Sequence, residues 1–150
     1  ALAALAALGP MGQAMAQTTV RDDAELLISQ IQTDKRAVVL TAMDMTDDQV
    51  RAFTPIYDKY QADMKKQFEQ AVEMLNKFAA NYGSMTDEAA KDILKEWFKL
   101  RDQRNSTMKR YAKEMERALP PTKVLQWVQI ENKLNALLDA QAASVIPVAR

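Results

Sequence analysis

Apolar residues recur every three or four positions along most of this chain, which is the spacing of one face of an α-helix. One apolar stripe runs from Phe53 to Tyr82 and another runs from Ile93 to Leu119, and no stretch shows the sustained alternation of a β-strand. Long helices joined by a short turn around Gly83 have to lie antiparallel. The pattern therefore predicts an all-α fold built on a long antiparallel helical hairpin.

Shorter helices are expected on both sides of the hairpin, for a total of four helices. The first covers residues 21–42, and the last follows Leu119-Pro120-Pro121, where a proline can occupy the first helical position. The residues predicted to face inward are Ala24, Leu27, Ile28, Ile31, Val38 and Val39 in the first helix, and Val124, Leu125, Val128, Leu134, Leu137 and Leu138 in the last. Both a four-helix bundle and a thinner hairpin that forms a curved dimer would bury these faces.

The first long helix has the best-marked start in the chain. Thr46 and Gln49 occupy the N-cap and third helical positions of a capping box, and Met45 and Val50 occupy the positions of a hydrophobic staple. The segment Met85-Thr86-Asp87-Glu88-Ala89 repeats this start with alanine in place of the glutamine. The second capping box is therefore expected to be half made.

Two residues bear on the course of this first long helix. Pro55 lies inside it and predicts either a kink near residues 51–53 or a start delayed to Pro55. Gly83 follows its last apolar position and is expected to end the helix in the left-handed conformation.

Residues 1–16, ALAALAALGPMGQAMA, carry no charge, and Gly9-Pro10 breaks their alanine–leucine run. Ala14-Met15-Ala16 then supplies the A-x-A pattern of a signal-peptide cleavage site. We expect a secretory signal peptide, truncated at its start and cleaved after Ala16, which leaves residues 17–150 as one helical domain. No stretch reaches the roughly 20 apolar residues of a membrane span, so no membrane insertion is expected. Without Cys, the mature protein fits the periplasm of a Gram-negative bacterium.

The composition removes several classes of chemistry. The chain has no His and no Cys, which takes away the usual general base, thiolate nucleophiles and zinc sites of the His and Cys type. Its 20 basic and 20 acidic residues cancel, so no net field favours nucleic acid. We expect no catalytic residue, no cofactor and no bound metal, and therefore a protein that is not an enzyme.

The segment Met45-Thr46-Asp47-Asp48-Gln49 resembles the Leu-Thr-x-x-Gln signature of the Spy/CpxP-like periplasmic proteins, in which it also opens a long helix. The resemblance covers residues 44–135, and Leu119-Pro120-Pro121-Thr122-Lys123 stands where a second signature is expected. Residues 127–133 and the apolar tail lie partly outside the shared pattern and indicate a divergent subfamily. It implies a curved helical dimer that binds unfolded or damaged envelope proteins without ATP. Metal binding, known in one branch of the family, is the first role to discard because that branch relies on His.

The second long helix has a local excess of basic residues beside its apolar stripe. The residues predicted to bind client proteins are Arg101, Arg104, Met108 and Tyr111 on this helix and Met64 and Phe68 on the first long helix. Arg104 interrupts an otherwise apolar seam, where it either attracts an acidic segment of a client or pairs with an acidic group on a neighbouring helix. Methionine suits surfaces that bind many partners, although core packing is the simpler interpretation of Met64 and Met108.

These observations predict a periplasmic, ATP-independent chaperone-like or envelope-stress binding protein. Its partners would be unfolded or envelope protein clients and, for the dimeric form, a second copy of the chain. The alternative is a structural or regulatory partner of one envelope protein, such as an accessory to a sensor. Metal sensing through the thioethers of Met43 and Met45 comes third.

Overall fold

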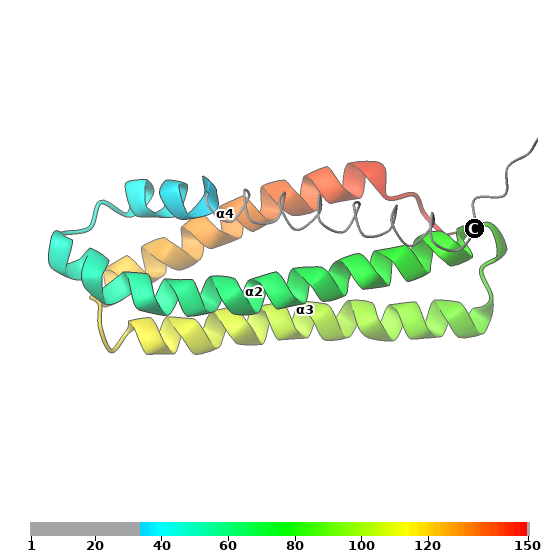
Figure 1. The fold of residues 1–150 in the computed structure, drawn as a ribbon, viewed down its shortest axis with the longest axis horizontal. Coiled ribbons are helices and arrows are strands. Elements are labelled where there is room, and N and C mark those ends of the chain that lie inside the picture. Colours follow the sequence, from blue (N-terminus) through cyan, green and yellow to red (C-terminus); the bar gives the residue numbers. More distant parts are fainter. Residues whose placement is uncertain (1–33, 150) are drawn as a thin grey trace, which may run out of the picture. The chain divides into compact units, whose positions relative to one another are not determined.

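The computed structural model describes residues 34–149, and all its regular structure is helical (Figure 1). The elements are α2 (Asp47–Asn81), the short 3-10 helix η1 (Tyr82–Ser84), α3 (Asp87–Met115) and α4 (Pro121–Val145). A helical segment at residues 34–43 precedes them. The described residues contain no strand, so the predicted all-α fold is confirmed. The predicted signal peptide and the predicted helical residues 21–33 lie outside the described residues.

The capping box at the start of α2 is present in full. The backbone N–H of Gln49 donates to Oγ1 of Thr46 at 3.3 Å, and the backbone N–H of Thr46 donates to Oε1 of Gln49 at 3.1 Å. Met45 packs against the hydrophobic core, as a staple residue should. The helix begins at Asp47 and continues past Pro55, so the delayed start is wrong. Figure 1 shows the first turns of α2 inclined to the rest of the helix, in line with the expected kink.

The three other predicted helix boundaries have different outcomes. Thr86 caps α3 by accepting the N–H of Ala89 at 3.2 Å, which confirms the half-made box. Pro121 occupies the first turn of α4, as predicted from the proline pair. The left-handed cap expected at Gly83 is wrong, because Gly83 lies inside η1 and has no positive φ. A 3-10 turn tightens the end of the helix there and needs no left-handed residue.

A positive φ occurs instead at Asp44, which has φ 45° directly after the segment that ends at Met43. Asp44 holds the left-handed position that ends many helices. The ammonium group of Lys123, at the start of α4, donates to the backbone carbonyls of Met43 and Asp44. This side chain satisfies carbonyls that the helix end leaves without an internal partner. It joins the start of α4 to the turn before α2.

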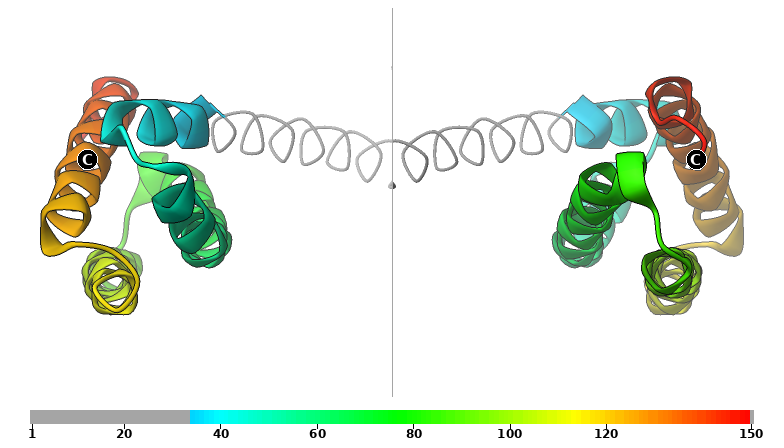
Figure 2. Two further views of the ribbon diagram at one scale, coloured as in Figure 1. Left: turned by 90° about the vertical axis from the view of Figure 1, so that its left-hand side faces the viewer. Right: turned by 90° about the vertical axis from the view of Figure 1, so that its right-hand side faces the viewer.

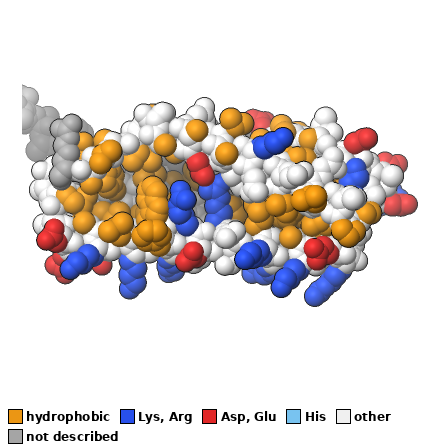
Figure 3. All heavy atoms as spheres, turned by 180° about the vertical axis from the view of Figure 1, so that it is seen from behind, with side chains coloured by type: hydrophobic (Ala, Val, Ile, Leu, Met, Phe, Trp, Pro, Cys, Tyr) orange, Lys and Arg blue, Asp and Glu red, His pale blue; other side chains and the backbone are white. Residues whose placement is uncertain are grey.

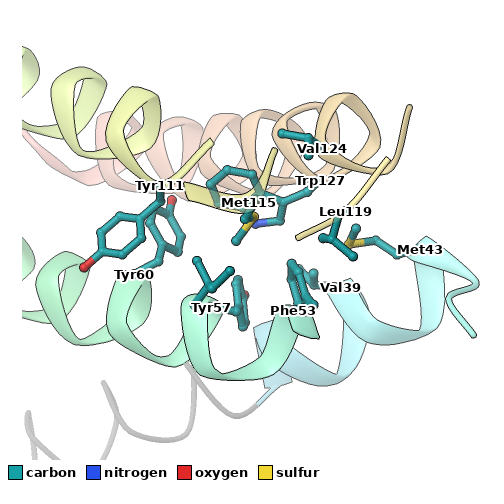
Figure 4. Packing of buried hydrophobic residues seen from close by; sticks show 11 residues of the cluster. Val39, Met43, Phe53, Tyr57, Tyr60, Tyr111, Met115, Leu119, Val124 and Trp127 are labelled. Carbon is teal, nitrogen blue, oxygen red and sulfur yellow. The ribbon is translucent and has the colours of Figure 1, made fainter. Parts of the chain in front are cut away.

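The hydrophobic core lies where α2, α3, α4 and residues 37–43 come together. Figure 4 shows its side chains converging from these elements, and Figure 2 shows the same helices end-on. We call this region the core end. Its buried residues are Val39, Met43, Phe53, Ile56, Tyr57, Tyr60, Tyr111, Met115, Leu119, Val124 and Trp127.

The inner face of α4 differs from the predicted one. Its buried residues are Val124, Trp127, Glu131 and Asn135. Leu125 and Leu137, which were expected to face inward, are 59% and 67% exposed, and Leu138 is 39% exposed. The reason is geometric: α4 is inclined to the hairpin and diverges from it toward its C-terminus (Figure 1), so within residues 34–149 no helix covers the leucines of its second half.

Candidate functional site

The most unusual group in the core end is the carboxylate of Glu131, which is fully buried. The hydroxyl of Tyr57 donates to its Oε1 at 3.2 Å, and the hydroxyl of Tyr60 donates to its Oε2 at 2.9 Å. Both tyrosines are on α2, one turn apart, and the carboxylate comes from α4. A buried carboxylate is tolerated only where hydrogen bonds satisfy its oxygens. The cluster therefore fixes the position of α4 along α2.

Two further aromatic rings pack against Tyr60, one of the tyrosines that bind this carboxylate. The ring of Trp127 meets that of Tyr60 edge-on, with centroids 5.0 Å apart and planes at 86°. Tyr111 meets Tyr60 in the same way at 5.6 Å, and its hydroxyl donates to Asp63 at 2.8 Å. Edge-to-face contacts of this kind add to the stabilisation from burial. Because Glu131 has no exposed surface, the cluster has the character of a packing element and offers a substrate no access.

Burial and charge raise the pKa of two of these phenols. The pKa of Tyr60 is raised well above its ordinary value, chiefly by burial and then by the negative charge and hydrogen bond of Glu131. The pKa of Tyr111 is raised by burial and by its hydrogen bond to Asp63. Both phenols thus stay protonated as hydrogen-bond donors to a higher pH than an ordinary tyrosine.

The other half of the hairpin has a different character. We call α2 residues 61–81, η1 and α3 residues 87–106 the distal half. Within these ranges Met74 is the buried side chain. Large apolar side chains are exposed instead, including Phe98 at 62%, Leu94 at 54% and Phe68 at 49%. Exposed apolar side chains that gather together mark interaction surfaces.

Basic side chains accompany these apolar residues on α3. The guanidinium of Arg101 lies over the ring of Trp97, 5.7 Å from its centroid. Within the described residues Lys95, Lys99 and Arg101 form no ion pair, whereas Lys77 of α2 pairs with Glu96. A shallow depression of about 470 Å³ lies between the helices here, lined by Lys77, Asp92, Ile93, Lys95, Glu96 and Lys99. The distal half therefore offers apolar contacts beside positive charge.

Figure 3 shows one face of the molecule, on which hydrophobic side chains gather to either side of a hollow with basic and acidic side chains inside it. One pair that links α3 to α4 is Arg104 and Asp139. Nη1 of Arg104 donates to both carboxylate oxygens of Asp139, at 3.0 and 3.1 Å. Of the alternatives raised for Arg104, the structure shows the pairing with a neighbouring helix.

The six residues predicted to bind clients differ in how far they are exposed. Phe68 and Arg101 are exposed on the distal half, and Arg104 is partly exposed and paired with Asp139. Met64 and Met108 are partly buried against the core, and Tyr111 is buried within it. The structure thus places Phe68, Arg101 and Arg104 where a partner could reach them, together with Leu94, Trp97 and Phe98, which the sequence analysis had not chosen.

Glu131 and Asp139 were also missed, although the sequence contains a signal for them. Trp127, Glu131, Asn135 and Asp139 are spaced four residues apart and therefore follow one face of α4. The polar identity of Glu131, Asn135 and Asp139 hid this face, because the spacing of apolar residues indicates the leucines beside it. The available signal was this regular spacing of polar residues in line with Trp127.

Residues 34–149 show no other candidate for a functional centre. No helix among them is both long and apolar enough to cross a membrane. No group of three or more acidic side chains among them is placed to hold a metal ion. No protein-family model, curated protein or solved structure matches the chain.

Proposed function

We propose that this chain is a periplasmic, ATP-independent chaperone-like protein that binds unfolded segments of envelope proteins. The observation that carries the proposal is the distal half, where Phe68 on α2 and Leu94, Trp97 and Phe98 on α3 are exposed, and where the Arg101 guanidinium lies over the Trp97 ring. Unfolded segments expose apolar side chains that such a surface can take from water. Basic side chains at the same place accelerate encounter with acidic segments.

The fold suits this function because the core end stabilises the molecule and the distal half is left to bind a client. The core end holds the helices together through buried aromatic side chains and the Glu131 cluster. The distal half can then leave its apolar residues uncovered without loss of the fold. The signal-like residues 1–16 and the resemblance of Met45–Gln49 to the Spy/CpxP-like signature support a periplasmic location.

The test is suppression of aggregation of a chemically unfolded client protein, measured by light scattering without ATP. We expect suppression by the wild-type chain, and weaker suppression by Phe98→Ser on the distal half. Leu125→Ser is the matched control, because Leu125 is 59% exposed and Phe98 62%, and Leu125 lies on α4 near the core end. No suppression by the wild type at stoichiometric excess would contradict the proposal.

A second function is favoured by the spacing of three residues on α3. Leu94, Phe98 and Arg101 follow one another at intervals of four and three, which places them in one stripe of the helix. Such a stripe suits docking against a helix of a single regulatory or structural partner. Capture of one saturable envelope partner, with indifference to unfolded clients, would favour this function over the first.

A further inference from the structure

The Arg104–Asp139 pair holds together two elements that otherwise separate. The exposure of the residues along the inner face of α4 rises from 0% at Trp127 and Glu131 to 7% at Asn135, and the Asp139 side chain is 57% exposed. Beyond Asn135, none of the described residues of α4 is buried. Asp139 is therefore the point at which the diverging second half of α4 reaches back to α3.

This contact is weak by its nature. The Arg104 side chain is 34% exposed and that of Asp139 is 57% exposed, so water and salt compete for both groups. Exposed ion pairs contribute only about 0.2–1 kcal/mol. An acidic group from another molecule can therefore replace Asp139 at little cost, provided that apolar contacts bring it to the same place.

Such contacts lie close to Arg104 along α3. Trp97 and Arg101 precede it by seven and three residues, which places all three on one side of the helix. The Arg101 guanidinium already covers the Trp97 ring. An apolar segment on this side of α3 would therefore bring its own charged groups within reach of Arg101 and Arg104.

We infer that Asp139 is an internal competitor for the acidic side chain of a bound polypeptide, so that the second half of α4 inhibits the surface beside it. The inference rests on the proposed function and specifies its client: an unfolded segment in which glutamate or aspartate follows apolar residues. In the free protein Arg104 is occupied by Asp139. On binding, the client carboxylate takes Arg104 and the second half of α4 is released.

Neutral substitutions of the two partners separate this role from a purely structural one. Asp139→Asn and Arg104→Gln both break the ion pair, so a simple tether predicts the same effect for both. Competition predicts opposite effects, because Asp139→Asn frees Arg104 for the client and Arg104→Gln removes the group that the client binds. Glu114→Gln is the matched control, since it removes one negative charge from another exposed pair, with Lys59.

The experiment measures binding of a short fluorescein-labelled peptide of leucine, phenylalanine and glutamate by fluorescence anisotropy at low salt. A second peptide carries glutamine in place of every glutamate. We expect Asp139→Asn to bind the acidic peptide about twofold to fivefold more tightly than the wild type, and Arg104→Gln to bind it more weakly by a similar factor. The glutamine peptide should bind all variants equally, and Glu114→Gln should match the wild type.

The possible results separate failure of this inference from failure of the proposed function. If the wild type binds both peptides and suppresses aggregation, but Asp139→Asn gains nothing or shifts in the same direction as Arg104→Gln, the inference fails and the proposed function stands. If neither the wild type nor Asp139→Asn binds either peptide and the client aggregates, both fail. Circular dichroism of each variant at the assay temperature confirms that the helices are intact.

Discussion

The two ends of the α2–α3 hairpin are made from the same pair of helices with the same spacing of apolar residues, and they differ in what covers them. At the core end, α4 and residues 37–43 complete the packing around Phe53, Tyr60 and Trp127. In the distal half, where α4 has diverged, residues such as Leu94 and Phe98 remain exposed. An apolar stripe thus specifies a helix, and a third element decides whether the stripe becomes core or surface.

This difference also separates stability from function in the molecule. Burial of apolar area stabilises a fold by about 25 cal/mol per Å², and most large buried side chains belong to the core end. Helices with little tertiary packing are marginal in water and open locally. The core end should therefore determine global unfolding, and the distal half should bind partners and open more readily.

Substitution of the two tryptophans should give the largest contrast. Trp127→Ala removes a fully buried side chain from the core end, whereas Trp97→Ala removes one that is 40% exposed on the distal half. We expect Trp127→Ala to lower the free energy of unfolding by about 3–5 kcal/mol and Trp97→Ala by about 1 kcal/mol or less. Urea denaturation followed by circular dichroism measures both. Equal losses would show that the distal half is packed as firmly as the core end.

The buried carboxylate should give the next largest effect. Glu131→Ala leaves the hydroxyls of Tyr57 and Tyr60 without this acceptor and leaves a cavity beside Trp127, so we expect a loss of about 2–4 kcal/mol. Glu114→Ala, which breaks an exposed pair, should cost about 1 kcal/mol or less. In the double variant with Tyr60→Phe, the losses should be less than additive because the two residues share one interaction. Strict additivity would mean that the hydrogen bond contributes nothing.

Alkaline pH should weaken the core end through Tyr60. Burial, and then Glu131, raises the pKa of Tyr60 in the folded state above its ordinary value of about 10. Above pH of about 10 the folded chain keeps a proton on Tyr60 that the unfolded chain releases. The contribution of neutral Tyr60 to the free energy of unfolding is therefore complete below pH of about 10 and is lost as the pH rises above it. The expected slope is about 1.4 kcal/mol per pH unit.

Urea denaturation at several pH values on either side of pH 10 measures this slope for the wild type and for Tyr60→Phe. The substitution should remove much of the alkaline loss, and what remains should include a contribution from Tyr111, whose pKa is also raised by burial. An unchanged slope in Tyr60→Phe would exclude Tyr60 as the group responsible.

The sequence predicted the helices well because their causes are local. Spacing of apolar residues, the Thr46–Gln49 box and the proline pair before α4 each act within a few positions, and the structure contains the helix starts that they indicate. The end at Gly83 was wrong because a 3-10 turn and a left-handed cap suit the same residues.

The arrangement of the helices was less accessible. Whether Leu137 or Glu131 faces inward depends on the direction in which α4 crosses the hairpin, and no local pattern specifies that direction. The expectation that apolar residues face inward then favoured Leu137 over Glu131. For the same reason the sequence pointed to Arg104 but could not identify Asp139, thirty-five residues later, as its partner.

The two threonine caps should give the smallest effects and the sharpest test of the comparison. Thr46 begins α2 at the core end, and Thr86 begins α3 in the distal half. Replacement of an N-cap threonine by alanine costs about 1 kcal/mol. Thr46→Ala should lower global stability by about this amount, because the start of α2 unfolds only with the core. If the start of α3 already opens by itself, Thr86→Ala should instead accelerate amide exchange in the first turns of α3 and leave the exchange of core amides nearly unchanged. Hydrogen–deuterium exchange resolved by residue measures both effects. Equal acceleration throughout the chain in both variants would mean that the hairpin unfolds as one cooperative unit, and the division into a stable core end and a separately opening distal half would then be wrong.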